Sequence, residues 1–104
     1  MRKLYVVKHA RDFEKIMNQG KCIKNRSYVV YSLENNLPYN RYGISVSKKL
    51  GNAVFRNRYK RIIRNIIDKN KKDYIIGKDY IIILRRDVLN KNYQLLEKEL
   101  IELI

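Results

Sequence analysis

The sequence predicts an α+β fold, in which one two-layer domain is built from a helix, two strands, a helix, a third strand and a last helix. The first observation behind this prediction is the length of 104 residues, which allows one domain with a modest core. The second is that segments with a helical spacing of apolar residues alternate with short runs of β-branched and aromatic residues. We therefore expect residues 1–104 to form a single domain.

The first third of the chain predicts a short helix followed by a strand. Residues 11–18 carry apolar side chains at helical spacing, namely Phe13, Ile16 and Met17. Gly20 follows as a C-terminal stop for this helix. Residues 26–33, with the sequence RSYVVYSL, are rich in β-branched and aromatic residues and predict the first strand.

The second strand is predicted at residues 41–47, RYGISVS, because Tyr, Ile and Val alternate there with Gly and Ser. The connection between the two strands, residues 34–40, contains three asparagines and the only proline of the chain. Because these residue types favour turns, we expect a hairpin loop that joins two neighbouring strands.

The most strongly charged segment is residues 48–64, KKLGNAVFRNRYKRIIR, with seven Lys or Arg and no acid. Asn52 is expected to cap a helix that runs to about Lys69. On a helical wheel one side, within about 140°, carries Arg56, Asn57, Lys60, Arg61 and Arg64. The other side carries Phe55, Tyr59, Ile62, Ile63 and Ile66. The helix therefore has a basic face and a core face.

The last third of the chain predicts a connection, a buried strand and a final helix. Residues 69–72, KNKK, with Asp73 and Gly77 beyond them, predict a polar connection. Residues 79–84 are nearly all apolar, which predicts a third strand that is buried. After residues 90–92 we expect a helix whose inward side carries Leu95, Leu96, Leu100, Ile101 and Leu103.

The charge of the chain predicts a polyanionic partner. The net charge is +14, from 24 basic and 10 acidic residues. The longest apolar run, residues 80–84, is too short to span a bilayer, so we expect a cytoplasmic protein with no membrane partner. Residues 93–104 carry three acids and one lysine, so the final helix is not expected to contact a nucleic acid.

No catalytic residue, metal ligand or protein-bound cofactor is predicted. The chain has one cysteine, Cys22, and one histidine, His9, which do not suffice for a disulfide or a zinc site. The aspartates are scattered singly, so no paired carboxylates are available for a two-metal nuclease site. With a single histidine, the chain also has few side chains suited to general acid–base catalysis.

Residues 43–64, GISVSKKLGNAVFRNRYKRIIR, resemble the signature of the protein subunit of bacterial ribonuclease P. The similarity extends to RDF at residues 11–13, to residues 26–33 and to KDYIII at residues 78–83. The resemblance implies a mixed sheet whose third strand is joined to the others by a left-handed β-α-β crossover through the basic helix. Such crossovers are right-handed in nearly all other proteins.

The resemblance also implies the function. The protein would assist a catalytic RNA that removes the 5′ leader from precursor tRNA, so its partners would be that RNA and the leader. Hydrolysis would be carried out by the RNA, which requires magnesium in the holoenzyme.

Two binding surfaces follow from the resemblance. The catalytic RNA would be contacted by Lys48, Lys49, Arg56, Asn57, Arg58, Lys60, Arg61 and Arg64. A cleft for the single-stranded leader would contain Phe13, Met17, Tyr31 and Ser45, because single strands bind by stacking over a positive groove.

Structural roles are the alternatives at several of these positions. Phe13 and Met17 could simply pack in the core. Arg58 could form a salt bridge within the domain, and Asn57 could contact Ser45 or Ser47.

Two residues depart from the family pattern. Met17 stands where an aromatic residue is common, and Leu84 ends the third strand where a smaller residue is usual, which affects the expected cleft floor.

Two other functions compete with this one. A DNA-binding or ribosomal protein would use the same basic helix in a groove, but that model has no role for the strands or for the pair Phe13 and Tyr31. A helix lying on a membrane surface is disfavoured by the polar turn at residues 51–52 and by the absence of tryptophan.

Overall fold

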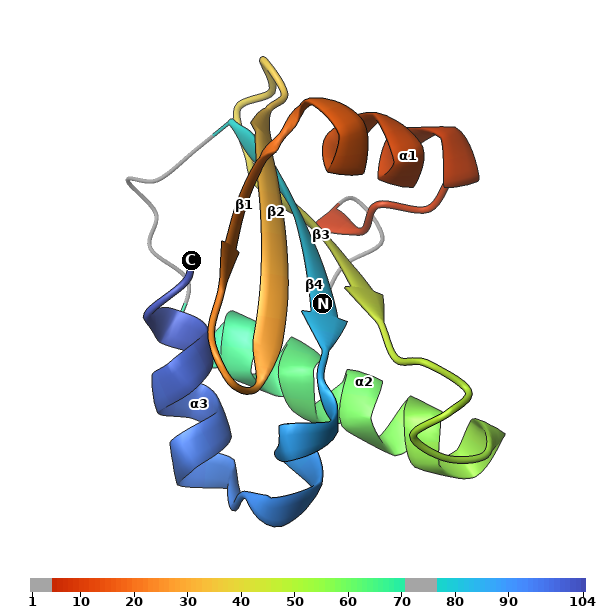
Figure 1. Ribbon diagram of the computed structural model, residues 1–104. Coiled ribbons are helices and arrows are strands. Elements are labelled where there is room, and N and C mark those ends of the chain that lie inside the picture. Colours follow the sequence, from red (N-terminus) through yellow and green to blue (C-terminus); the bar gives the residue numbers. More distant parts are fainter. Residues whose placement is uncertain (1–4, 71–76) are drawn as a thin grey trace.

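The computed structural model of the chain describes residues 5–70 and 77–104 (Figure 1). The elements are α1 (Ala10–Gln19), β1 (Lys21–Lys24), β2 (Tyr28–Glu34), β3 (Arg41–Ser45), α2 (Ala53–Lys69), β4 (Lys78–Leu84), the 3-10 helix η2 (Arg86–Asn90) and α3 (Tyr93–Ile101). The α+β class and the order of the predicted elements are confirmed. The structure adds β1 and η2, which were not predicted.

The strands form one mixed sheet in the order β1-β2-β4-β3. β2 is antiparallel to β1 and β4, whereas β3 is parallel to β4. The predicted hairpin between residues 26–33 and 41–47 is therefore wrong, because β4 lies between these two strands. The physical reason is burial: β4 is the most apolar strand, and a central position covers it on both faces.

The hairpin of the fold joins β1 and β2 instead. All four residues of β1 are exposed, and lysines stand at both of its ends. Charged residues are common on edge strands because they discourage pairing with other chains. They also hide the apolar pattern by which a strand is predicted, which explains why β1 was missed.

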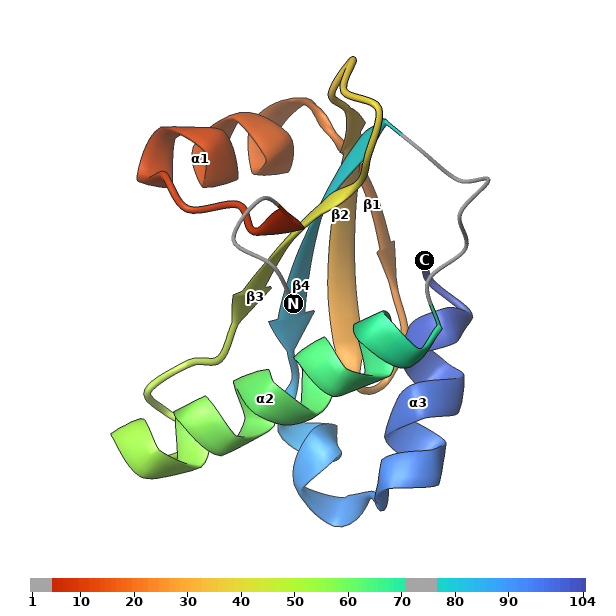
Figure 2. The same ribbon diagram turned by 180° about the vertical axis from the view of Figure 1, so that it is seen from behind.

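The segment β3-α2-β4 forms a left-handed crossover, as the resemblance implied. In Figure 2 both strands run downward, β4 lies to the right of β3, and α2 lies in front of the sheet. When the view is turned so that the strands run upward, the chain passes through the helix in front to a strand on the left. That is the rarer hand of a β-α-β unit.

α2 begins and ends near the predicted residues. The Asn52 side chain accepts a hydrogen bond from the Phe55 amide at 2.9 Å, which confirms the cap. The helix ends at Lys69, and the amide of Asn70 donates to the carbonyls of Ile66 and Ile67. Of the predicted polar connection, residues 71–73 lie outside the described residues.

α2 and α3 pack on one face of the sheet and form the main core with it. The fully or nearly fully buried residues of this core include Tyr28, Val30, Tyr80, Ile82, Leu84, Ile63, Ile66, Ile67, Leu96 and Leu100. Leu84 therefore faces these helices and does not line the opposite, partly open face. In α3, Leu96 and Leu100 are buried as predicted, but Leu95 is 41% exposed because the buried stripe of this short helix is narrow.

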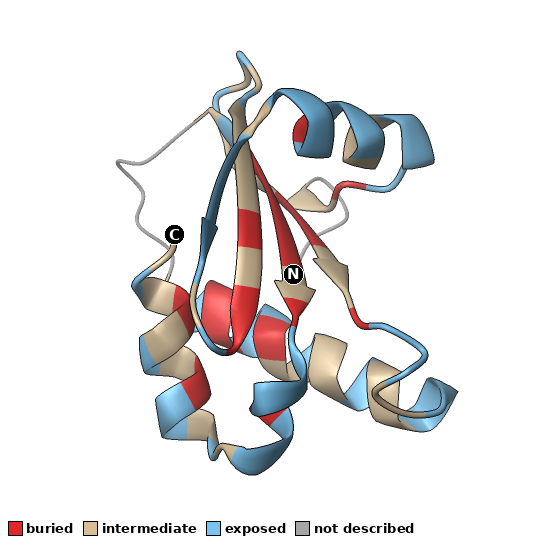
Figure 3. Ribbon diagram, in the orientation of Figure 1, coloured by how far each residue is buried: buried red, intermediate tan, exposed pale blue. Residues whose placement is uncertain are grey.

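α1 covers only part of the opposite face of the sheet. Ile16 is 1% exposed and packs with Val7 and Ile81, and this second core is bordered by Phe13, Tyr31, Leu33 and Ile83, which are half-buried. Figure 3 shows that the outer side of α1 is largely exposed while the middle of the sheet is buried. No helix among the described residues covers the remainder of this face, whose residues are partly exposed.

Candidate nucleic-acid interface

The basic side of α2 faces away from the sheet. Asn57, Arg58, Arg61 and Arg64 are exposed, as are Lys48 and Lys49 in the preceding loop. Within residues 5–70 and 77–104, no ion pair joins any of these cations to an acid. The salt bridge considered for Arg58 is thus not observed there. Like charges held this close repel each other, and an anionic ligand would relieve that repulsion.

Arg56 and Lys60 lie at the margin of this basic side and are half-buried. Both lie on nearly the same line of the helix as Ile67, which follows Arg56 by eleven residues and Lys60 by seven and is 1% exposed. The core side of α2 is therefore rotated toward them relative to the predicted wheel. Arg56 Nε is buried, and no described atom accepts a hydrogen bond from it. An unpartnered buried donor costs about 1–3 kcal/mol, which an incoming phosphate oxygen would offset.

Asn57 is exposed, and in the described part of the chain no hydrogen bond joins it to Ser45 or Ser47. The bracing role considered for Asn57 is therefore not observed.

The four residues predicted for the leader cleft lie on one side of the sheet. In the sheet, Tyr31 pairs with Ile81 and Ser45 pairs with Ile83. The side chains of these four strand residues therefore emerge on the face that α1 covers. Phe13 belongs to the small core under α1, and Met17 of the same helix is 40% exposed. Phe13 thus combines packing with partial exposure, whereas Ile16 is the buried anchor of α1.

The strand register arranges the floor of this face in two rows. One row consists of the cross-strand partners Cys22, Tyr31, Ile81 and Gly43. The next row consists of Lys24, Val29, Ile83 and Ser45. The sequence analysis missed Lys24, Val29 and Ile83 because their position depends on which strands pair and in which register. The alternation of residues 29, 31, 81 and 83 was the only local signal.

The Tyr31 hydroxyl lies beside the thiol of its cross-strand partner Cys22. A hydrogen bond with this thiol raises the pKa of Tyr31 above its ordinary value, and the thiol's charge when ionised adds to the shift. The phenol is therefore neutral at physiological pH. It offers an apolar ring and a polar hydroxyl to a base on the same face.

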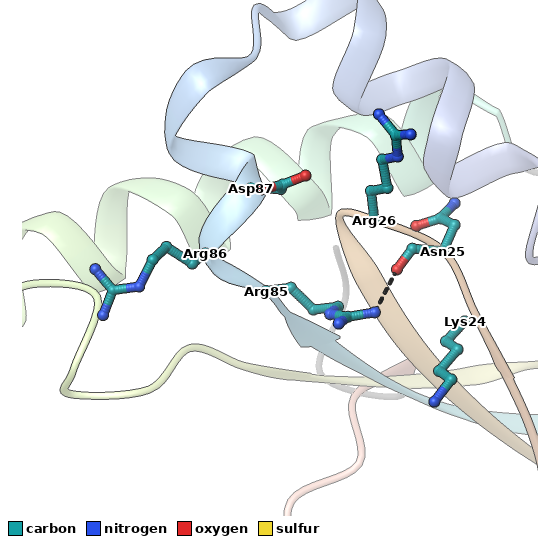
Figure 4. A pocket seen from close by; sticks show the side chains of 6 residues that line it. All are labelled: Lys24, Asn25, Arg26, Arg85, Arg86 and Asp87. Carbon is teal, nitrogen blue, oxygen red and sulfur yellow. Dashed lines mark hydrogen bonds between the residues drawn. The ribbon is translucent and has the colours of Figure 1, made fainter.

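A basic pocket of about 420 Å³ lies where β4 ends, next to the turn between β1 and β2 (Figure 4). It is lined by Lys24, Asn25, Arg26, Arg85, Arg86 and Asp87, so its lining carries four cations and one acid. Arg85 Nη1 donates to the Asn25 carbonyl at 2.8 Å, which holds this guanidinium against the turn. Sequence analysis missed the pocket because about sixty residues separate its two halves.

The turn that carries half of this pocket is anchored to α3. Asn25 Oδ1 accepts from the amides of Ser27 and Tyr28 at 3.0 Å, and its Nδ2 donates to the Glu99 carbonyl at 2.8 Å. Burial raises the pKa of Glu99, but bonds from Lys91 and Ser27 outweigh this, and the net pKa is lowered. The charged carboxylate thus fixes the turn. The two acids of α3, Glu97 and Glu99, thus form their ion pairs and hydrogen bonds within the domain.

The described residues contain no group of three or more His, Cys, Asp or Glu side chains arranged to hold a metal ion. Asp79 is buried and pairs with Arg41 through bonds of 2.6 and 2.8 Å, and Asn35 Nδ2 donates to it as well. Among the helices that the structure describes, none is long and apolar enough to cross a membrane.

Comparison with known proteins gives one consistent match. The family model described as Ribonuclease P matches residues 1–104. The ribonuclease P protein component of Streptococcus agalactiae serotype III (strain NEM316) is 47% identical over 107 residues, which cover 100% of this chain and 94% of that protein. The ribonuclease P protein component from Geobacillus kaustophilus (strain HTA426) is 42% identical over 105 residues, which cover 100% of this chain and 87% of that protein.

Solved structures agree with the sequence matches. A Staphylococcus aureus RNase P protein mutant with defective mRNA degradation activity superposes with a TM-score of 0.88 at 40% identity, covering 96% of this chain and 85% of that one. The RNase P protein from Thermotoga maritima gives a TM-score of 0.86 at 32% identity, and the match covers 93% of this chain and 92% of that one.

Proposed function

Because the chain belongs to the ribonuclease P protein family, we propose that it serves tRNA 5′ maturation by holding two RNA molecules at once. One is the catalytic RNA subunit, which carries out hydrolysis with its magnesium ions. The other is the single-stranded leader of precursor tRNA. The protein contributes binding and orientation, and none of its side chains acts as the nucleophile.

The observation that carries this proposal is the placement of two different surfaces on opposite sides of one sheet. α2 packs on one face and turns its cations outward, whereas α1 leaves part of the other face open. The loop with Lys48 and Lys49 joins β3 to α2 and thus links the two sides. A protein built in this way can lie between a structured RNA and a single strand.

The basic side of α2 is suited to the sugar-phosphate backbone of the catalytic RNA. Arg58, Arg61 and Arg64 are exposed and have no acidic partner among the described residues. A guanidinium binds two phosphate oxygens at once, which a lysine cannot do. The buried Nε of Arg56 is a further donor that this RNA would satisfy.

The open face of the sheet is suited to the leader. Bases would stack on Tyr31 and Phe13 over the apolar floor formed by Val29 and Ile83. Lys24 at the end of that row would meet a phosphate. The basic pocket beside β4 continues this path and would receive phosphates of the leader as it leaves the sheet.

Reconstitution tests the proposal directly. The protein is mixed with a bacterial ribonuclease P RNA and precursor tRNA at a magnesium concentration where the RNA alone barely cleaves. We expect cleavage at the leader junction to be restored by the native chain and lost when Arg61 and Arg64 are both changed to Ala. The control is Lys78→Ala with Lys98→Ala, which removes the same charge outside α2.

If the native chain binds RNA tightly but does not stimulate cleavage, the subunit role is refuted. The chain would then act as a general RNA- or DNA-binding protein that shares only the fold. Equal loss of cleavage in the control pair would show that net charge, and not the basic side of α2, is what matters.

A further inference from the structure

Gly43 lies in the middle of β3, is buried, and pairs with Ile81 of β4. A Cβ atom built on Gly43 would lie 2.6 Å from Phe13 Cζ, 3.2 Å from Phe13 Cε1 and 2.9 Å from Ile81 Cδ1. Real Cβ atoms essentially never show contacts under 3.0 Å, and the contacts with Phe13 Cζ and Ile81 Cδ1 are both shorter than that. The ring of Phe13 therefore occupies the space that any side chain at position 43 would need.

Two other glycines, Gly20 and Gly77, are explained by the backbone, and a Cβ added at Gly51 would meet the side chain of Phe55, only four residues further along the chain. Gly43 differs because the side chain that fills its space, Phe13, comes from an element distant in the sequence. Gly77 has a φ of +84°, a conformation that favours glycine. At Gly20 an added Cβ would meet the carbonyl oxygens of Ile16 and Ser32 at 2.5 Å. Gly43 lies in regular strand pairing and would meet only side chains, so its lack of a side chain serves the placement of Phe13.

We propose that Gly43 is a positioning residue for leader recognition, because it lets the Phe13 ring settle onto the sheet at one end of the row that contains Tyr31. This proposal rests on the proposed function, in which these two rings contact the leader. The ring would close the Gly43 end of that row and leave Tyr31 and the next row accessible. Phe13 would then act as the fixed wall of the cleft.

The anchoring of α1 makes this position sensitive to Gly43. Ile16 is 1% exposed and holds α1 to the sheet, so the helix has little freedom to lift. A methyl group at position 43 would instead push the ring outward, into the space above Tyr31. The wall would move into the path of the leader, and the stacking geometry would be lost.

The test measures dissociation constants of the reconstituted holoenzyme for precursor tRNA with and without its leader. We expect Gly43→Ala to weaken binding of the leader-bearing tRNA by about tenfold, within the range for one stacked base. Binding of mature tRNA should not change. The matched control is Ser32→Ala in β2, which is separated from β3 by β4 and alters the opposite face of the sheet.

A double-mutant cycle separates positioning from a general loss of stability. If Gly43 acts through the ring, Gly43→Ala has no further effect on leader binding once Phe13 is changed to Ala. Additive losses would overturn the proposal. Should Gly43→Ala alone fail to fold, its combination with Phe13→Leu provides the space that the methyl group needs, and leader binding is measured on that pair against Phe13→Leu alone.

The two proposals fail in distinguishable ways. If Phe13→Ala leaves leader binding unchanged, the leader cleft itself is misplaced. If Phe13→Ala weakens leader binding but a folded Gly43→Ala does not, the leader cleft stands and the positioning role of Gly43 is wrong.

Discussion

At the scale of single residues, the side chains of the open sheet face combine packing with accessibility. Tyr31 borders the small core under α1 and still presents its ring beside the exposed Cys22. Phe13 behaves similarly on the other side of the face. A residue of this kind contributes both to the stability of the domain and to ligand binding. The effect of its substitution must therefore be judged by the ratio of the affinities for precursor tRNA with and without the leader.

Tyr31 provides the first test at this scale. We expect Tyr31→Ala to weaken binding of leader-bearing precursor tRNA by about 1–3 kcal/mol, because a stacked base would lose its platform. Tyr31→Phe keeps the ring and loses only the hydroxyl, so most of the affinity should remain. Titration of the holoenzyme with both substrates measures this. An equal loss for mature tRNA would contradict recognition of the leader through Tyr31.

At the scale of elements, α2 is the part of the fold that sequence analysis describes best. Its cap at Asn52, its end at Lys69 and its division into two sides all follow from residues close together in the chain. The rotation of the buried side toward Ile67 was not predicted. It depends on how the helix lies on the sheet, and it decides that Arg56 and Lys60 are half-buried while Arg61 and Arg64 are exposed.

This division predicts how binding responds to salt. Neutralising about six phosphates would make the logarithm of the binding constant fall steeply with the logarithm of salt concentration, by about 0.9 per phosphate on a duplex. Arg61→Ala and Arg64→Ala should each reduce that slope by about one unit. Binding to the catalytic RNA is measured over a salt series, with Lys98→Ala as the control. If the slopes stay unchanged, α2 does not contact the catalytic RNA.

At the scale of the whole molecule, the fold brings distant segments together into the leader path. The pocket beside β4 unites residues 24–26 with residues 85–87, and α3 holds the first of these segments through Glu99. Each segment contributes only two basic residues. Only the pairing of β1 with β2 and of β2 with β4 creates a basic surface there.

The pocket leads to a prediction about leader length. Arg86 is exposed, and its side chain makes no hydrogen bond or ion pair within the described residues, so Arg86→Ala should leave the fold intact. We expect the substitution to weaken binding of a precursor with a long leader severalfold and to leave binding of one with a very short leader unchanged, because the long leader alone would reach the pocket. Lys98→Ala serves as the control. Equal effects on both substrates would place Arg86 outside the leader path.

Residues close together in the chain were enough to predict the class of each main element, the two sides of α2, the excess of positive charge and the signature at residues 43–64 that identifies the family. The tertiary structure decided what depends on long-range pairing. It placed β4 between β2 and β3, added the exposed strand β1, and aligned Tyr31, Ile81 and Gly43 in one row. The reason is that periodicity shows which face of a strand is apolar, whereas the neighbour of that strand is set by the burial of the whole sheet.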